Sequence, residues 1–148
     1  MYLRPLLLSA VFLVISAVYA MAAPVHGYWL THKSKGMIRI SPCGPGLCGQ
    51  VVWLRQPLNK AGQPVRDIKN RDARLRGRPV MGLTTFSGLA PVAPNQWSGT
   101  FYNPEDGRIY RGSITLVSQS QIKVQACRIN SGTCGSRNWK RAQQRAQN

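Results

Sequence analysis

Apolar and polar residues alternate over several short stretches of this chain, as they do in β-strands with one buried face. In the clearest stretch, Ile122, Val124 and Ala126 are separated by single polar residues, and Ile38 and Ile40 show the same spacing. The pattern predicts a mainly β protein. The segments predicted as strands are 28–31, 37–40, 50–54, 79–86 (broken near Gly82), 97–102, 109–117, 122–126 and 137–142.

Turn-forming sequences separate most of these segments and predict hairpin connections. Residues 42–46 pack two prolines and two glycines into five positions, and in residues 103–107 Asp106-Gly107 supplies the positive φ of a hairpin loop. Further turns are predicted at 91–95 and 128–136. About eight antiparallel strands with such connections can close into an up-and-down barrel, which removes the sheet edges, or pack as a two-sheet sandwich. An eight-stranded barrel has room inside for side chains or one small ligand.

Residues 55–78 differ from the rest of the chain and predict one long basic loop. They contain two prolines, few large apolar groups and a possible helical turn at 72–75. No amphipathic stripe of helical length is present, so a membrane-surface helix is not supported. Long loops in compact domains are often functional. The basic residues are Arg55, Lys60, Arg66, Lys69, Arg71, Arg74, Arg76 and Arg78.

The N-terminus has the three parts of a secretory signal. Arg4 precedes an apolar run from 6 to 18, and small residues follow that allow cleavage after Ala20 or Ala22. The run is short for a transmembrane helix, although an uncleaved anchor is the alternative. We therefore predict a signal peptide at 1–22, a single domain at 23–148, a periplasmic or secreted location, and no stable membrane span after cleavage.

All four cysteines lie in the predicted mature part, as two close pairs. In an exported protein this pattern indicates disulfides, and we favour Cys43–Cys48 and Cys127–Cys134 among the three possible connectivities. Neither pair has the spacing of a zinc knuckle or of a C-x-x-C redox motif, so no metal or cofactor is predicted.

The charge of the chain is strongly positive, because 20 lysines and arginines face only four acidic residues and give a net charge of +16. A field of this size attracts polyanions by counterion release. For an exported protein, anionic lipid head groups, envelope polymers and nucleic acid are possible partners. Solubility alone would also explain the charge. The acidic residues are Asp67, Asp72, Glu105 and Asp106.

Ordered motifs over nearly the whole mature chain resemble the bacterial exported family known as domain of unknown function 2147. The resemblance implies a lipocalin-like barrel and no known reaction. Two features depart from the family pattern: the Cys127 and Cys134 pair, and the basic stretch 33–35. The motifs are Gly27-Tyr28-Trp29, Ile40-Ser41-Pro42-Cys43-Gly44, residues 47–54, Asn70, residues 75–79, Gly82-Leu83, Trp97-Ser98-Gly99, residues 102–110 and Trp139-Lys140-Arg141.

The two ends of the mature chain also resemble the signature that closes lipocalin barrels. Gly27 and Trp29 form a Gly-x-Trp motif on the first strand, and the last strand carries arginines. We expect Trp29 at the barrel floor, with Arg141 or Arg137 over its ring in a cation–π contact.

Catalytic residues are scarce. His26 and His32 have no neighbouring acid in sequence to orient them, and we expect both to be exposed. Glu105 and Asp106 could act as an acid–base pair, but turn geometry explains them without chemistry. We predict that the protein is not an enzyme, with a hydrolase as the least favoured function.

The sequence therefore predicts a lipocalin-like binding protein that holds a small apolar or amphipathic ligand. The alternative is a basic surface protein that engages anionic polymers. Most of the aromatic residues considered as ligand-binding residues could instead be core positions of the barrel. The Arg76–Arg78 segment could instead be a solvated loop. The candidate ligand-binding residues are Trp29, Trp53, Arg78, Tyr102, Tyr110 and Arg141.

Overall fold

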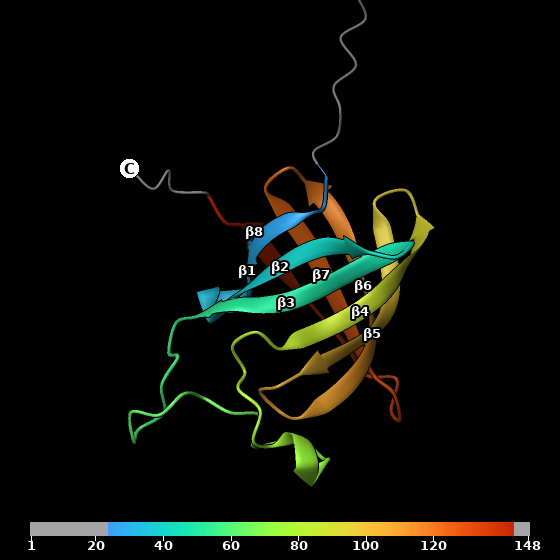
Figure 1. The fold of residues 1–148 in the computed structure, drawn as a ribbon. Helices are drawn as coiled ribbons and strands as arrows, with labels where there is room; N and C mark the ends of the chain where they lie inside the picture. The colour runs from blue at the N-terminus through green and yellow to red at the C-terminus, as the bar shows by residue number, and fades with distance from the viewer. Residues whose placement is uncertain (1–23, 144–148) are drawn as a thin grey trace, which may run out of the picture.

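The computed structural model describes residues 24–143, which form a closed barrel of antiparallel strands joined in sequence order (Figure 1). This confirms the predicted up-and-down barrel and excludes the sandwich. The predicted signal peptide lies outside the described residues. The elements are β1 (Gly27–Leu30), η1 (His32–Ser34), β2 (Gly36–Cys43), β3 (Gly46–Leu54), η2 (Ala73–Leu75), β4 (Thr84–Ala93), β5 (Gln96–Asn103), β6 (Arg108–Ser118), β7 (Gln121–Arg128) and β8 (Cys134–Arg141).

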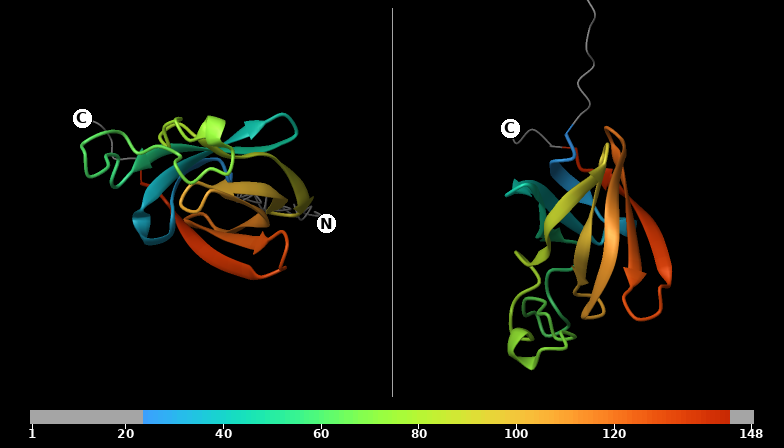
Figure 2. Two further views of the ribbon diagram at one scale, coloured as in Figure 1. Left: turned by 90° about the horizontal axis from the view of Figure 1, so that it is seen from below. Right: turned by 90° about the vertical axis from the view of Figure 1, so that its right-hand side faces the viewer.

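The two ends of the barrel differ in their connections (Figures 1 and 2). One end, at the top of Figure 1, carries the tight β4–β5 and β6–β7 turns and the start of the described chain. The other end carries the long connection 55–83 and the β5–β6 and β7–β8 turns. We call them the closed end and the open end.

Trp29 and Arg141 fill the closed end. Trp29 is fully buried and its Nε1 donates a hydrogen bond to the Val25 carbonyl at 2.8 Å. The Arg141 guanidinium lies 4.2 Å from the centre of the indole ring, as predicted for one of the two arginines. It also donates hydrogen bonds to the carbonyl oxygens of Pro24, His26 and Gln119. One side chain therefore ties the N-terminal segment and the β6–β7 turn to the last strand.

Large side chains pack the barrel between the closed end and its middle. Small residues on neighbouring strands make room for them: a Cβ at Gly49 on β3 would lie 2.2 Å from the ring of Phe86, its partner on β4, so only glycine fits there. Large buried side chains therefore occupy this half of the barrel. Ile40, Leu89, Ile114 and Ile122 are completely buried in it.

The structure corrects the predicted bounds of β4. Residues 79–83 are not a strand. Instead, the backbone there crosses to β3, where Gly82 donates to the Val51 carbonyl and Val51 donates to the Leu83 carbonyl. The strand runs on to Ala93, through Pro91, where a shift in the β4–β5 register accommodates the proline. The long connection therefore spans 55–83, and it contains the predicted helical turn as η2.

Both favoured disulfides are present. Cys43–Cys48 joins β2 to β3 beside their turn, and Cys127–Cys134 joins the end of β7 to the start of β8. The second bond marks the start of β8 three residues earlier than the sequence pattern predicted. Within residues 24–143, no helix is long and apolar enough to cross a membrane.

Replacing Arg141 with methionine should lower the free energy of unfolding by about 2–3 kcal/mol, because three carbonyl acceptors and the Trp29 ring lose their partner. The control is Arg137→Met, four residues away on the same strand face; its guanidinium bonds only the adjacent Ser136 carbonyl. That change should cost less than about 0.5 kcal/mol. Urea unfolding of the two variants measures the difference, and equal effects would show that Arg141 does not hold the closed end together.

Candidate functional site

A cavity of about 520 Å³ occupies the half of the barrel toward the open end. Strands β2 to β8 and the long connection supply its walls, and its inner surface is mainly apolar. Since the other half of the barrel is packed, this cavity is a pocket with a floor. Its apolar lining residues are Ile38, Val51, Leu54, Val80, Phe101, Val124, Ala126 and Trp139.

An ion pair crosses the rim of this pocket. Lys35, in the β1–β2 connection, places its Nζ 2.9 Å from Oε1 of Glu105 in the β5–β6 turn. Both side chains are exposed, so the pair contributes little to stability. Its effect is local: the charge of Lys35 is neutralised and the Glu105 carboxylate is engaged, while Arg137, which also lines the pocket, is in no such pair within residues 24–143.

The long connection is fixed over the open end by a buried carboxylate, Asp67, which sequence reasoning did not single out. Asp67 is completely buried, and the Arg78 guanidinium contacts its Oδ2 through Nε and Nη2, both at 2.9 Å. Asn70 Nδ2 donates to the same oxygen at 2.8 Å, while the Tyr102 hydroxyl donates to Oδ1. A buried charge is tolerated only when it is paired and hydrogen-bonded, and all of these partners meet that need.

Tyr102 links this cluster to the barrel wall. The Arg78 guanidinium lies 5.3 Å from the centre of the Tyr102 ring, and Asn70 Nδ2 donates to the Tyr102 hydroxyl oxygen at 2.9 Å. Burial of the phenol, together with the hydrogen bond to Asp67 and its charge, raises the pKa of Tyr102 from 10.0 to about 12. Tyr102 therefore stays protonated and acts as a fixed donor to Asp67.

Gly107 shows how closely the connection packs on the β5–β6 turn. A Cβ at this position would lie 1.8 Å from the Lys69 carbonyl oxygen, and the φ of +69° also favours glycine. Lys69 Nζ in turn donates to the Glu105 carbonyl at 2.7 Å. The connection is thus held against the turn by close backbone packing as well as by the Asp67 cluster.

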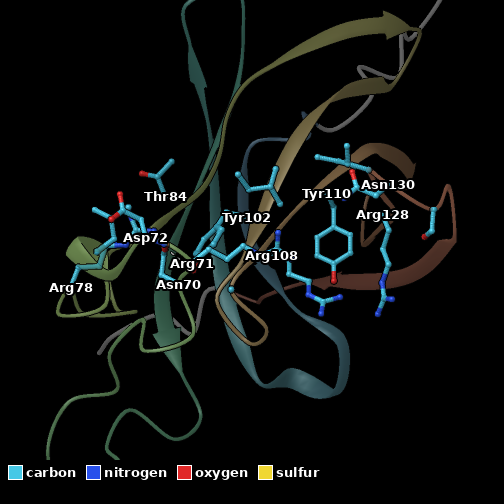
Figure 3. A pocket seen from close by; sticks show the side chains of 15 residues that line it. Asn70, Arg71, Asp72, Arg78, Thr84, Tyr102, Arg108, Tyr110, Arg128 and Asn130 are labelled. Atoms are coloured by element: carbon cyan, nitrogen blue, oxygen red, sulfur yellow. Dashed lines mark hydrogen bonds between the residues drawn. The ribbon is translucent and has the colours of Figure 1, made fainter.

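A groove of about 810 Å³ lies next to the pocket, between the connection and the β5–β6 and β7–β8 turns (Figure 3). Tyr102 and Tyr110 line both spaces, so the groove adjoins the pocket. The Tyr110 hydroxyl donates to Asp106; this bond, then burial, raises the pKa of Tyr110, while the positive charge of Arg128 opposes the rise. The groove is lined by Asn70, Arg71, Asp72, Leu75, Arg78, Thr84, Tyr102, Gly107, Arg108, Ile109, Tyr110, Arg128, Ile129, Asn130 and Ser131.

The structure divides the predicted ligand-binding residues into two groups. Arg78, Tyr102 and Tyr110 converge at the open end, where they line one or both spaces. Trp29 and Arg141 lie at the closed end and line neither space, because their polar groups and rings are already used to close the barrel.

Trp53, the remaining candidate, also lines neither space and is 39% exposed. The pocket is instead lined by Trp139, which the sequence analysis placed in the last strand without a ligand-binding role. Arg137, Trp139 and Arg141 are each two residues apart and therefore share one face of the last strand. This spacing is the signal that could have identified Trp139 as a residue facing the barrel interior.

Of the histidine and acidic candidates, His32 and Glu105 line the pocket, whereas His26 and Asp106 line neither space. His26 and His32 are exposed, as expected. Asp106 accepts hydrogen bonds from the Tyr110 hydroxyl and the Arg108 backbone N–H, as in a turn. In this part of the chain, no three His, Cys, Asp or Glu side chains are grouped so that they could hold a metal ion.

Comparisons with known proteins agree with this barrel. The profile of a family described as "Uncharacterized protein conserved in bacteria (DUF2147)" matches residues 27–141, and the chain belongs to this family. Protein HP1028 from Helicobacter pylori, described as a member of the lipocalin family, has a similar structure with a TM-score of 0.69. The two sequences are 18% identical over 83% of this chain and 86% of that one, a level at which the likeness shows a lipocalin-like fold. None of the curated proteins matches the sequence.

Titration of Tyr102 tests the cluster. Because its pKa is raised in the folded state, the stability it contributes is complete below pH 10 and is lost as the pH rises from 10 toward 12. Absorbance at 295 nm measures the ionised tyrosines. Tyr102→Phe should have one tyrosine fewer than the parent protein that ionises in the late part of the titration.

Tyr102→Phe should also lose about 1–2 kcal/mol of unfolding free energy at pH 7. Ionisation of Tyr102 near pH 10 would contradict its burial against Asp67.

Proposed function

We propose that this protein binds one small apolar or amphipathic molecule in the pocket of the barrel. The observation that carries the proposal is the apolar pocket of about 520 Å³, closed by a packed floor and open at the rim. Typical sites for small ligands have volumes of roughly 300–1,000 Å³ and mainly apolar walls with few polar groups. The lipocalin-like fold and its likeness to HP1028 support this function.

The polar groups at the pocket favour binding over catalysis. Glu105 is paired with Lys35, and Asp106 is engaged by Tyr110 and by the backbone of Arg108. A general acid or base needs an available carboxyl or imidazole group that a second residue orients toward the substrate. We therefore propose a carrier or sensor of its ligand.

We further propose that the protein acts outside the cytoplasm, in the periplasm or after secretion. The pairing of Cys43 with Cys48 and of Cys127 with Cys134 supports this location, because disulfides form and persist in oxidising compartments. The signal-like sequence at the N-terminus supports it independently.

Filling the pocket should abolish binding. The bulky side chain of Ala126→Trp would project into the pocket, whereas Gln125→Trp, at the neighbouring exposed position on β7, would point away from it. With N-phenyl-1-naphthylamine as a neutral fluorescent probe, Ala126→Trp should bind at least about tenfold more weakly, and Gln125→Trp should bind like the parent. Near-ultraviolet circular dichroism checks that both variants fold. Equal binding by a folded Ala126→Trp protein would exclude the pocket as the site.

Export can be tested by intact mass. The full chain, expressed in a bacterium and recovered by osmotic shock, should lack about 20 N-terminal residues. Reduction should increase its mass by four hydrogens, as two disulfides require. Recovery of the uncleaved chain in the cytoplasmic fraction, with reduced cysteines, would contradict the proposed location.

A further inference from the structure

The groove beside the pocket carries arginines that form no ion pair in the described chain. Of the arginines that line it, Arg78 is committed to Asp67. The groove's one acidic lining residue, Asp72, is likewise committed to Arg74 at 2.8 Å. The remaining lining arginines, which form no ion pair within residues 24–143, are Arg71, Arg108 and Arg128.

Strand register brings two of these cations to Tyr110. Arg128 is the cross-strand partner of Tyr110 in the β6–β7 ladder, so both side chains leave the same face of the sheet. Arg108 precedes Tyr110 by two residues and shares that face. Figure 3 shows the guanidinium groups of Arg108 and Arg128 extending in the same direction as the Tyr110 hydroxyl. The nearby acid, Asp106, accepts hydrogen bonds from that hydroxyl and from the Arg108 backbone N–H; both donors are neutral, so the carboxylate keeps its negative charge beside the arginines.

The second disulfide holds one wall of the groove. Cys127–Cys134 joins β7 to β8 directly beside Arg128, whose backbone N–H also bonds the Thr133 carbonyl at 2.9 Å. The turn that contributes Ile129, Asn130 and Ser131 to the groove is thereby closed at its base. Fixing a binding wall before the ligand arrives lowers the entropy cost of binding.

The groove is amphipathic and adjoins the apolar pocket. Leu75, Ile109 and Ile129 line it together with the arginines, and Tyr102 and Tyr110 form the wall that it shares with the pocket. We propose that the groove binds the oxyanion head group of an amphiphile, a phosphate monoester, while the apolar chain of the same molecule lies in the pocket. This inference rests on the proposed function and specifies the class of its ligand.

The number and type of the free cations favour phosphate as the oxyanion. The guanidinium fork donates paired hydrogen bonds to phosphate oxygens, and the three such groups, even with the one negative charge of Asp106 subtracted, exceed what a single carboxylate would neutralise. A phosphate monoester carries nearly two negative charges at pH 7 and offers three strong acceptor oxygens.

The test compares two probes that share one alkyl chain: dodecyl phosphate below its micellar concentration, and dodecanol below its solubility limit. Calorimetric titration of the parent protein should show dodecyl phosphate binding at least about tenfold more tightly than dodecanol, because only the phosphate reaches the arginines. The advantage should shrink as salt rises, since the groove is partly exposed to solvent.

Charge-removing variants locate the head group. Arg108→Gln and Arg128→Gln should each weaken dodecyl phosphate binding by roughly fivefold and leave dodecanol binding unchanged. The matched control is Arg111→Gln: Arg111 is an exposed arginine on the same strand, β6, that lines neither the groove nor the pocket. It should bind both probes like the parent.

The outcomes separate this inference from the proposed function. Equal affinity for the two probes, or equal effects of Arg111→Gln and Arg128→Gln, would overturn the head-group site while the pocket stands. Failure of dodecanol and dodecyl phosphate alike to bind would overturn the pocket itself. Inorganic phosphate binding as tightly as dodecyl phosphate would overturn the shared ligand, because the groove would then be a separate anion site.

Discussion

The barrel depends on the contact between its first and last strands. β1 and β8 meet through only two residue pairs, Trp29 with Arg141 and Leu30 with Lys140, whereas β7 and β8 are joined along their full length. Side chains reinforce this short seam. Arg141 covers the Trp29 ring and bonds three carbonyls, and the Ala142 backbone N–H donates to the Tyr28 carbonyl at 2.8 Å. An open seam would leave two unpaired strand edges.

One end of the barrel is filled by side chains, and the cavity lies toward the other end. The completely buried large side chains lie toward Trp29. Phe101 and Val124 are also buried, and they line the pocket. The open end still needs a defined shape, and the long connection supplies it through Asp67. A buried carboxylate that loses its partners is strongly unfavourable in free energy. The contacts of Arg78, Asn70 and Tyr102 with Asp67 therefore hold the connection in one place.

The strand pattern could be predicted because each strand has one buried face. The alternation of Ile122, Val124 and Ala126 reports that face directly, and the Gly-x-Trp motif located the closed end. The start of β4 was misplaced because Val80 and Leu83 are buried in a loop that packs on β3, so apolar character there did not mean a strand. Asp67 was missed for the converse reason: within a run of charges, nothing local marks the one side chain that will be fully buried.

The arginines show most clearly what sequence cannot resolve. A chain with a net charge of +16 offers many equivalent cations, yet their surroundings give them different roles. The Arg141 guanidinium is hydrogen-bonded to backbone carbonyls, and the Arg78 guanidinium is paired with the buried carboxylate of Asp67. Arg108 and Arg128 keep their charge beside Tyr110, where the groove meets the pocket. Only tertiary structure decides which positive charges remain available, and here those at the groove lie next to the apolar pocket. That juxtaposition favours an amphiphile over a purely apolar ligand.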